Sequence, residues 1–375
     1  MTILWKQKSV LLSLVGLAQA VTYHVTKEYS GSTFFNDWDF YGSHDNLTNG
    51  DVEFISASEA RTPSSLAYVD PNTNRAIVKV DNTTEVPYME KRKAVRITSK
   101  DAFPVGSVFI TDIHHAPWTW AAADDNWPAG GEIDIFEGIN QETRSQMGLH
   151  TEPGCVQTSP NQLTTEVRST DCHGPNNEGC IVSNTDPASY GPAFAAAGGS
   201  VFVTEFAETG ISIWFFSRAN IPGSITPTAT SIDTATLGTP MGHWPATGCD
   251  INRFFRPQNL VFAITLCGDF ARPPDIFGRT CEGQCYLDFV IQDPGYYSNA
   301  YFDIAYVKVL STEPSSSTDI ASSPAASRFS TVTAPNGDAS ETDASESAAF
   351  GRSLLVSGVG LGALILIPAA LVYLI

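Results

Sequence analysis

Basic residues are scarce in this chain of 375 residues, which has 21 lysines and arginines against 40 aspartates and glutamates. The resulting net charge of −19 argues against nucleic acid or an anionic membrane surface as the main partner. A neutral polymer such as a polysaccharide is indifferent to this charge. Hydrophobic residues make up 42% of the chain, which is enough for a substantial core.

Cysteine is absent from the first part of the chain and then occurs seven times, at Cys155, Cys172, Cys180, Cys249, Cys267, Cys281 and Cys285. In an oxidising compartment most of these should be paired, and the odd number leaves one over. They form one group from Cys155 to Cys180 and another from Cys249 to Cys285, but the spacing leaves the pairing open. No matching Cys/His pair lies near Cys281 and Cys285, which argues against zinc. We expect no metal and no cofactor.

Helical periodicity and internal repeats are also lacking between residues 22 and 310. Short runs rich in Val, Ile, Phe, Tyr and Thr alternate there with Gly, Pro, Asn and Asp, which is typical of strands and turns. The clearest expected strands span residues 76–80, 95–98, 107–110, 201–204, 211–216, 260–266 and 301–309. Many short strands over this length predict an all-β sandwich or jelly roll that forms one domain.

The first twenty residues resemble a secretory signal. Lys6 and Lys8 precede an apolar run, and Ala18-Gln19-Ala20 has the small-x-small form of a cleavage site. We therefore expect 1–20 to be a signal peptide, and 21–310 to be the folded domain of a secreted protein. Asn46-Leu47-Thr48 and Asn82-Thr83-Thr84 are possible N-glycosylation sites.

The composition changes again after the last expected strand. Residues 311–350 are dominated by Ser, Thr, Ala, Pro and acids, which predicts a disordered stalk. Residues 351–375 include the uncharged apolar run Leu354–Ile375, which is long enough to span a bilayer. Small residues between Asn336 and Ser347, a polar spacer and this tail favour a GPI-anchor signal over a retained transmembrane helix. We expect a cell-surface protein that meets the membrane only through this anchor or tail.

No lysine or arginine lies between Lys100 and Arg144, although this stretch contains Glu132, Asp134 and Glu137 among large apolar residues. In a strand, Glu132 and Asp134 point to one face, whereas Glu137 would point to the other. A β-bulge within Ile135-Phe136 would return Glu137 to the face of the other two acids. The alternative is a solvated edge strand. Buried acids without basic partners are more often functional, so we favour a catalytic set.

Two carboxyls that flank a glycosidic bond can hydrolyse it, one as nucleophile and one as proton donor. The Asp-Thr-Gly motifs of aspartic proteases and the Gly-x-Ser-x-Gly elbow of serine hydrolases are both absent. Sugars stack on indoles, and Trp118, Trp120 and Trp127 lie just before the acids. This combination favours a saccharide substrate.

The stretch Gly131-Glu132-Ile133-Asp134-Ile135-Phe136-Glu137 resembles the bulged signature of glycoside hydrolase family 16. The segments around it resemble the fungal laminarinase-like branch, as do Gly148 to Cys155, Trp214 to Arg218, Gly248 to Ile251, Cys267 to Phe270 and Tyr301 to Val309. The resemblance covers nearly all of residues 22–310. It implies a β-jelly-roll sandwich, concanavalin A-like, with a concave glucan-binding cleft, and retaining endo-glucanase activity.

By motif position, the resemblance implies that Glu132 is the nucleophile, Asp134 its electrostatic helper and Glu137 the acid/base. It further implies substrate-binding roles for Trp120, Trp127, Asn140, His150 and Arg92. Some positions depart from the family pattern: Ala116 stands where a subsite Trp is usual, and Phe206 and Phe270 each replace a Trp. The adjacent His114 and His115 face opposite ways on a strand, so we expect surface or cleft-edge roles rather than a metal site.

We therefore predict a monomeric endo-β-1,3 or mixed β-1,3(4)-glucanase that acts by double displacement on a β-glucan polysaccharide. A cell-wall glucan transglycosylase, in which a second glucan replaces water, is the nearest alternative. A non-enzymatic glucan-binding surface protein is a further alternative, although it would be expected to have a broken acid set. The linkage preference, the anchor attachment site and the use of the two sequons stay open.

Overall fold

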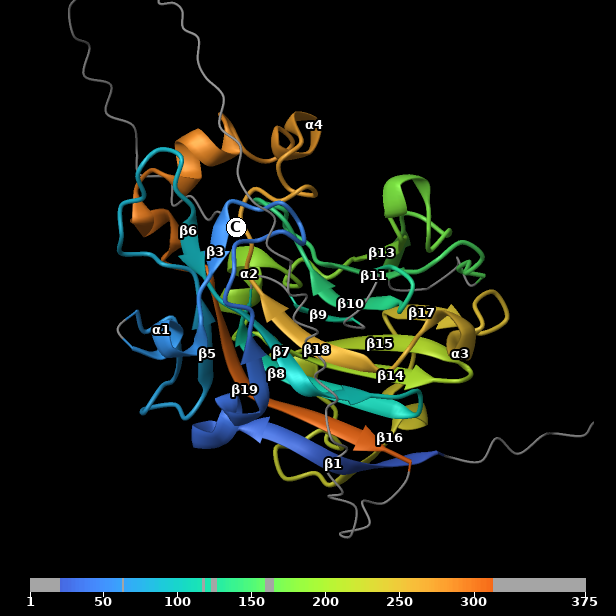
Figure 1. The fold of residues 1–375 in the computed structure, drawn as a ribbon. Coiled ribbons are helices and arrows are strands. Elements are labelled where there is room, and N and C mark those ends of the chain that lie inside the picture. The colour runs from blue at the N-terminus through green and yellow to red at the C-terminus, as the bar shows by residue number, and fades with distance from the viewer. Residues whose placement is uncertain (1–20, 63, 117–118, 123–126, 159–164, 313–375) are drawn as a thin grey trace, which may run out of the picture. The chain divides into compact units, whose positions relative to one another are not determined.

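The computed structural model describes residues 21–62, 64–116, 119–122, 127–158 and 165–312, with the backbone alone at 119–122. Two antiparallel β-sheets form this folded part, as Figure 1 shows. This arrangement confirms the all-β jelly-roll sandwich predicted from the strand pattern. The predicted signal peptide, and the stalk and tail beyond residue 312, lie outside the described residues.

The first sheet has nine strands, with β16-β1-β19-β8-β14-β15-β17 in order and β5 and β4 branching from β19. Its strands are β1 (Thr22–Ser30), β4 (Ala67–Val69), β5 (Ala76–Lys79), β8 (Ser107–His115), β14 (Ser200–Ala207), β15 (Gly210–Ser217), β16 (Ser231–Asp233), β17 (Gly242–Pro245) and β19 (Tyr301–Ser311). Strand β19 comes from the end of the described chain and pairs with both β1 and β8, so non-local pairing closes the fold.

The second sheet has eight strands in the order β12-β13-β11-β10-β9-β18-β7-β2. Its strands are β2 (Trp38–Phe40), β7 (Arg96–Phe103), β9 (Thr119–Ala122), β10 (Glu132–Glu137), β11 (Gln146–His150), β12 (Thr165–Val167), β13 (Cys180–Asn184) and β18 (Gln258–Ala263). A separate short parallel pair joins β3 (Val52–Phe54) and β6 (Arg92–Ala94). The acidic stretch therefore forms β10, an interior strand of the second sheet rather than an edge strand.

Helices in the described part are short, as the lack of helical periodicity predicted. They are α1 (Ala57–Arg61), α2 (Gly191–Ala196), α3 (Ile251–Phe254) and α4 (Pro274–Phe277), with further short 3-10 segments and a π-helical one over Cys285–Val290. None of the described helices is both long and apolar enough to cross a membrane.

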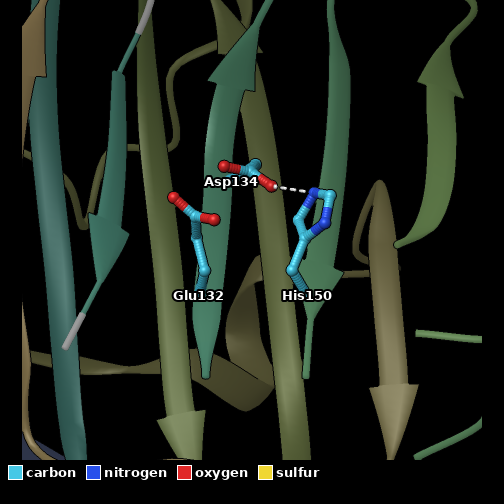
Figure 2. Close-up of side chains that lie close together, drawn as sticks. All are labelled: Glu132, Asp134 and His150. Carbon is cyan, nitrogen blue, oxygen red and sulfur yellow. Dashed lines mark ion pairs between the residues drawn. The ribbon is translucent and has the colours of Figure 1, made fainter. Parts of the chain in front are cut away.

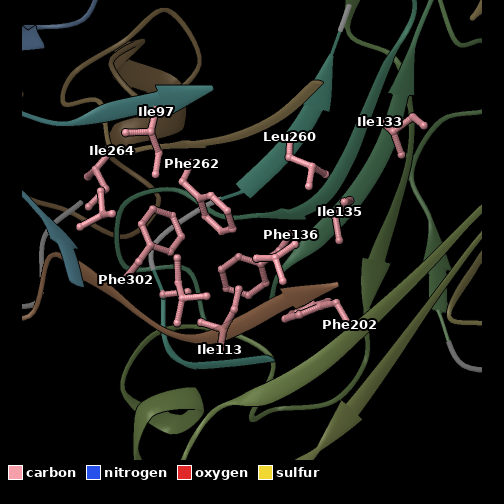
Figure 3. Close-up of a cluster of buried hydrophobic side chains, with 14 of the residues drawn as sticks. Ile97, Ile113, Ile133, Ile135, Phe136, Phe202, Leu260, Phe262, Ile264 and Phe302 are labelled. Carbon is pink, nitrogen blue, oxygen red and sulfur yellow. The ribbon is translucent and has the colours of Figure 1, made fainter. Parts of the chain in front are cut away.

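The main hydrophobic core lies between the two sheets, as Figure 3 shows. Ile133 and Phe136 of β10 pack there together with Phe202 of β14 and Phe302 of β19. Aromatic rings interlock: the centroids of Phe136 and Phe202 are 5.1 Å apart, in an edge-to-face arrangement. The core therefore fixes one face of β10, and the opposite face is left for polar side chains.

Three disulfides reinforce the second half of the fold. Cys172–Cys180 and Cys267–Cys285 each stay within one of the two cysteine groups seen in the sequence, whereas Cys155–Cys249 connects them. The unpaired cysteine is Cys281, which is buried. Tertiary proximity decides this pairing, and the spacing of the cysteines alone could not.

Candidate active site

Strand β10 carries the predicted bulge. Asp134 pairs with Gly148 of β11 and Glu137 pairs with Gln146, so Ile135 and Phe136 together lie opposite the single residue Met147. One extra residue on a strand reverses the side-chain alternation beyond it. The structure therefore confirms a bulge at Ile135-Phe136.

The bulge brings the three acids to one face of the sheet. Residues directly opposite each other on paired strands share a face, and Glu132, Asp134 and Glu137 lie opposite His150, Gly148 and Gln146. Those three partners alternate along β11, so they too share a face. The intervening apolar residues of β10 belong to the core between the sheets.

Glu132 accepts a hydrogen bond from the indole of Trp127, with 2.5 Å between Nε1 and Oε2. Trp127 remains 52% exposed, and its ring centroid lies 5.9 Å from that of His150. An exposed indole beside a reacting carboxylate offers an apolar face to a sugar ring. The structure thus places an exposed Trp127 indole beside Glu132, and its role as a substrate platform stays a prediction.

Asp134 forms an ion pair with His150 across the two strands, as Figure 2 shows. The Nε2 atom of His150 is 3.1 Å from Oδ2 of Asp134, and both side chains are largely buried. The other ring nitrogen, Nδ1, is 2.8 Å from the backbone carbonyl of Asn177. His150 is therefore clamped between a carboxylate on one side and a carbonyl on the other.

Glu137 accepts a hydrogen bond from Gln146, with 2.5 Å between Nε2 and Oε2. The carboxyl is almost completely buried. Gln146 was not among the site residues predicted from the sequence. The sequence could have indicated it, because Gln146 lies two residues before Gly148 and four before His150, and alternate residues of a strand share a face.

Burial and mutual repulsion raise the pKa values of both glutamates. Burial first, and then the charge of Asp134, raise the pKa of Glu132 to about 7 and that of Glu137 to about 8. Burial lowers the pKa of His150, but pairing with Asp134 and the charges of both glutamates outweigh it and raise the pKa to about 10. At neutral pH the site can therefore hold a protonated Glu137 and an imidazolium at once.

Glu132, Asp134 and His150 could in principle hold a cation, because their nearest ligand atoms all lie within 4.8 Å of one another. Both nitrogens of His150 already face acceptors, however, and a metal would have to displace a tightly held proton. Asp134 and His150 are better suited to setting the pKa values of Glu132 and Glu137.

The remaining predicted substrate residues differ in their placement. Trp120 lies on β9, beside β10, but its side chain is outside the described residues, as is Trp118. Asn140 follows β10, has a φ of 52°, and donates from Nδ2 to the carbonyl of Ala271 at 3.1 Å. Its side chain is almost buried and ties the end of β10 to the segment after Cys267.

Arg92 requires a correction. Its side chain is fully buried, and its guanidinium donates to the backbone carbonyls of Val290, Gln292, Asp81 and Thr84. It also lies over the ring of Tyr297, 4.7 Å from the centroid. This burial contradicts a subsite role, because no part of the guanidinium can reach a glucan, and Arg92 instead joins two segments of the fold.

The histidine pair on β8 lies on the other sheet. The Nδ1 atom of His115 is 2.7 Å from the backbone carbonyl oxygen of Tyr301. The imidazole also stacks on the Tyr301 ring, with the ring centroids 4.0 Å apart. His114 lies 3.8 Å from Asp112. The two side chains therefore have separate partners and do not form a joint metal site.

Comparison with known proteins supports this picture. A family model described as "XgeA-like, catalytic GH16 domain" matches residues 38–310. A probable glycosidase of Schizosaccharomyces pombe is 36% identical, over 78% of this chain and 70% of the relative. A probable endo-1,3(4)-β-glucanase of Aspergillus fumigatus is 33% identical over 78% of this chain, but the chain spans only 46% of that relative's length.

Two solved structures are also similar to this chain. Laminarinase 16A of Phanerochaete chrysosporium, with β-glucans in its donor and acceptor sites, is 32% identical, with a TM-score of 0.73 over 77% of this chain and 99% of that one. A family 16 β-1,3-glucosyltransferase described as elongating is 35% identical, with a TM-score of 0.70 over 77% and 100% of the two chains.

Proposed function

Because this chain belongs to glycoside hydrolase family 16, we propose that it is a retaining endo-glucanase acting on β-1,3 or mixed β-1,3(4)-glucan. The observation that carries the proposal is the bulge in β10, which puts Glu132 and Glu137 on one face with Asp134 between them. Two carboxyls on one face, held at different pKa values, are what double displacement needs.

In the first step, the ionised carboxylate of Glu132 attacks the anomeric carbon while Glu137 donates its proton to the leaving glycosidic oxygen. In the second step, Glu137 takes a proton from water, whose oxygen then displaces Glu132 from the sugar. Glu132 is the more readily ionised of the two, because the Trp127 N–H that it accepts lowers its pKa, and so it is available as the nucleophile. Glu137 is the better acid because its pKa lies near 8.

Asp134 contributes in two ways. Its negative charge raises the pKa of Glu137, which keeps the proton donor loaded. Its ion pair with His150 places a positive charge beside the two glutamates. This positive charge lowers the pKa of Glu132 and so offsets part of the effect of Asp134 on that carboxyl. Trp127, His150 and Trp120 are the side chains proposed to contact the glucan.

The test of the mechanism uses Glu132→Ala with and without sodium azide. The variant should lose at least about a thousandfold in reducing-sugar release from laminarin, and azide should restore turnover of an activated glycoside. The product should be a glycosyl azide of inverted anomeric configuration, because azide then attacks directly. Glu166→Gln, an exposed acid on β12 of the same sheet, is the matched control and should keep full activity. Full activity in Glu132→Ala would refute the mechanism.

Transglycosylation is the second candidate, favoured by the similarity to an elongating glucosyltransferase. The chemistry up to the glycosyl-enzyme is the same, and only the acceptor differs. Incubation with laminari-oligosaccharides separates the two: a hydrolase gives only shorter products, whereas a transferase also gives longer ones. Side-by-side assays on laminarin, lichenan and barley glucan would then determine the linkage preference. A non-enzymatic glucan-binding protein would release no sugar from any of them.

We also propose that the protein is secreted and held at the cell surface by a GPI anchor. The support is compositional: a charge-apolar-small order over 1–20, a Ser/Thr-rich segment over 311–350 and an uncharged apolar run beyond it. Phospholipase C should release the protein from intact cells if the anchor is present. Asn46 is exposed and Asn82 half-buried, so a mass shift on N-glycan removal is expected first at Asn46.

A further inference from the structure

The loop between Cys172 and Cys180 lies against one side of the His150 ring. A disulfide closes it, and the backbone N–H of Thr151 donates to the carbonyl of Cys172. Ser169 donates from its hydroxyl to the carbonyl of Gly179 at 2.7 Å. The loop is thus fastened at both ends next to the strand that carries His150.

Within the loop, the carbonyl of Asn177 points at Nδ1 of His150, 2.8 Å away. A carbonyl oxygen only accepts hydrogen bonds, so Nδ1 must carry a proton. Asn176 and Asn177 reach this geometry with φ values of 56° and 62°. Asparagine is among the few residues other than glycine that tolerate this left-handed region.

Because Gly179 has no side chain, the imidazole of His150 can occupy the space beside it. A Cβ built at this position would lie 2.7 Å from Cε1 and 2.9 Å from Nδ1 of His150, and 2.8 Å from the carbonyl oxygen of Leu149. Gly179 also has a φ of 78°, which side chains rarely adopt. Any side chain here would push the ring away from the Asn177 carbonyl.

In the described part of the chain, the charged groups found to act on His150 come from β10. They are Asp134, paired at 3.1 Å, and the carboxyls of Glu132 and Glu137. The loop supplies a carbonyl and a glycine, and the Trp127 indole lies on the remaining side. Whether His150 holds its proton therefore depends on how closely the ring stays against Asp134.

We propose that the 172–180 loop is a positioning element of the active site, in which Gly179 and the Asn177 carbonyl hold His150 against Asp134 so that both ring nitrogens donate to an acceptor. This inference rests on the proposed function, since it assigns the loop a part in the same site. The resulting positive charge lowers the pKa of both glutamates and so keeps Glu132 available as an ion. Gly179 acts through His150 and is a positioning residue, not a catalytic one.

The experiment compares Gly179→Ala with Gly174→Ala. Gly174 lies in the same loop with a φ of 59°, but a Cβ there meets nothing closer than 3.6 Å. Both substitutions place a side chain at a positive φ, with Gly174 at ψ 177°, so both strain the backbone, and only Gly179→Ala also collides with His150. The first measurement is the NMR titration of the His150 ring in the substrate-free protein. The second is the pH dependence of kcat/KM on laminarin.

We expect His150 to stay protonated beyond pH 8 in the wild type and in Gly174→Ala. In Gly179→Ala it should titrate near its ordinary value of about 6.5, and kcat should fall roughly 10- to 100-fold. The acid limb of kcat/KM should also move up by about one pH value, because Glu132 loses a neighbouring positive charge.

An unchanged His150 titration in Gly179→Ala, or an equal effect in both variants, would overturn the proposal. Should Gly179→Ala not fold, the double variant Cys172→Ala/Cys180→Ala opens the loop without a collision, and an unchanged His150 titration there would refute it equally. The NMR result does not depend on catalysis. If the protein proved inactive on glucans but His150 lost its proton only in Gly179→Ala, the proposed function would fail and the positioning role would stand.

Discussion

Replacing the proposed proton donor should make the protein more stable while it makes the enzyme inactive. Glu137 is buried, and its pKa rises from an ordinary value of 4.5 to about 8. The substitution Glu137→Gln removes the titrating proton but keeps the shape of the side chain. Its amide oxygen can still accept from Nε2 of Gln146, so the existing hydrogen bond is preserved.

The sign of the effect follows from proton linkage. Below pH 4.5 Glu137 is protonated in both the folded and the unfolded chain, so it does not affect stability. Between 4.5 and about 8 the unfolded chain releases this proton and the folded protein retains it, so the wild type loses stability as pH rises. From pH 4.5 to pH 7 the wild type thus loses about 3.4 kcal/mol of unfolding free energy, because each pH value contributes about 1.36 kcal/mol.

Roughly half of this, about 2 kcal/mol, should appear in Glu137→Gln, because Glu132 and His150 readjust their protonation when a neighbouring acid is removed. Chemical denaturation at pH 5, 6, 7 and 8 measures the difference in the free energy of unfolding. The gain should grow over that range and correspond to a rise in Tm of about 4 °C at pH 7. Glu166→Gln should show no such trend. A variant less stable than the wild type at pH 7, or a gain independent of pH, would refute the assignment of Glu137 as a buried, protonated acid.

Four further predictions follow from the same contacts. The kcat/KM profile on laminarin should be bell-shaped with limbs near pH 7 and 8, set by ionisation of Glu132 and deprotonation of Glu137; an optimum below pH 5 would contradict it. Trp127→Phe removes the N–H donated to Glu132, so kcat/KM should fall roughly tenfold and the acid limb should move upward, whereas an unmoved limb would show that the contact is idle. Arg92→Ala leaves buried carbonyls without a donor and should cost about 3 kcal/mol or more of unfolding free energy with KM unchanged; a raised KM with full stability would restore a subsite role. Phe136→Ala empties a site in the core and should cost about 3–5 kcal/mol by denaturant titration, while a loss below about 1 kcal/mol would mean that the bulge is not supported by packing.

The sequence predicted the structure correctly where the evidence lay within a single strand. The run of acids and isoleucines in β10 predicted both the strand and the bulge, because side-chain alternation has a period of two and an extra residue breaks it visibly. The lack of helical periodicity likewise matched the short helices. Each of these inferences needs only neighbours along the chain.

Arg92 illustrates where such inference failed. Its assignment to a subsite came from family resemblance, whereas its four carbonyl partners lie in segments around residues 81–84 and 290–292. An arginine at a cleft and an arginine that joins two segments look alike in a sequence. Only the burial of the guanidinium distinguishes them.

The sequence by itself determined the fold class, the sheet face shared by three acids and the chemistry that such a face can perform, because these depend on residue types and short spacings. The tertiary structure alone decided the pairing of the cysteines, the burial that raises the pKa values of Glu132 and Glu137, and the clamp on His150. Those features arise where segments far apart in the chain meet. Gly179 is the clearest case, because its lack of a side chain leaves room for the ring of His150, which is twenty-nine residues away in the chain.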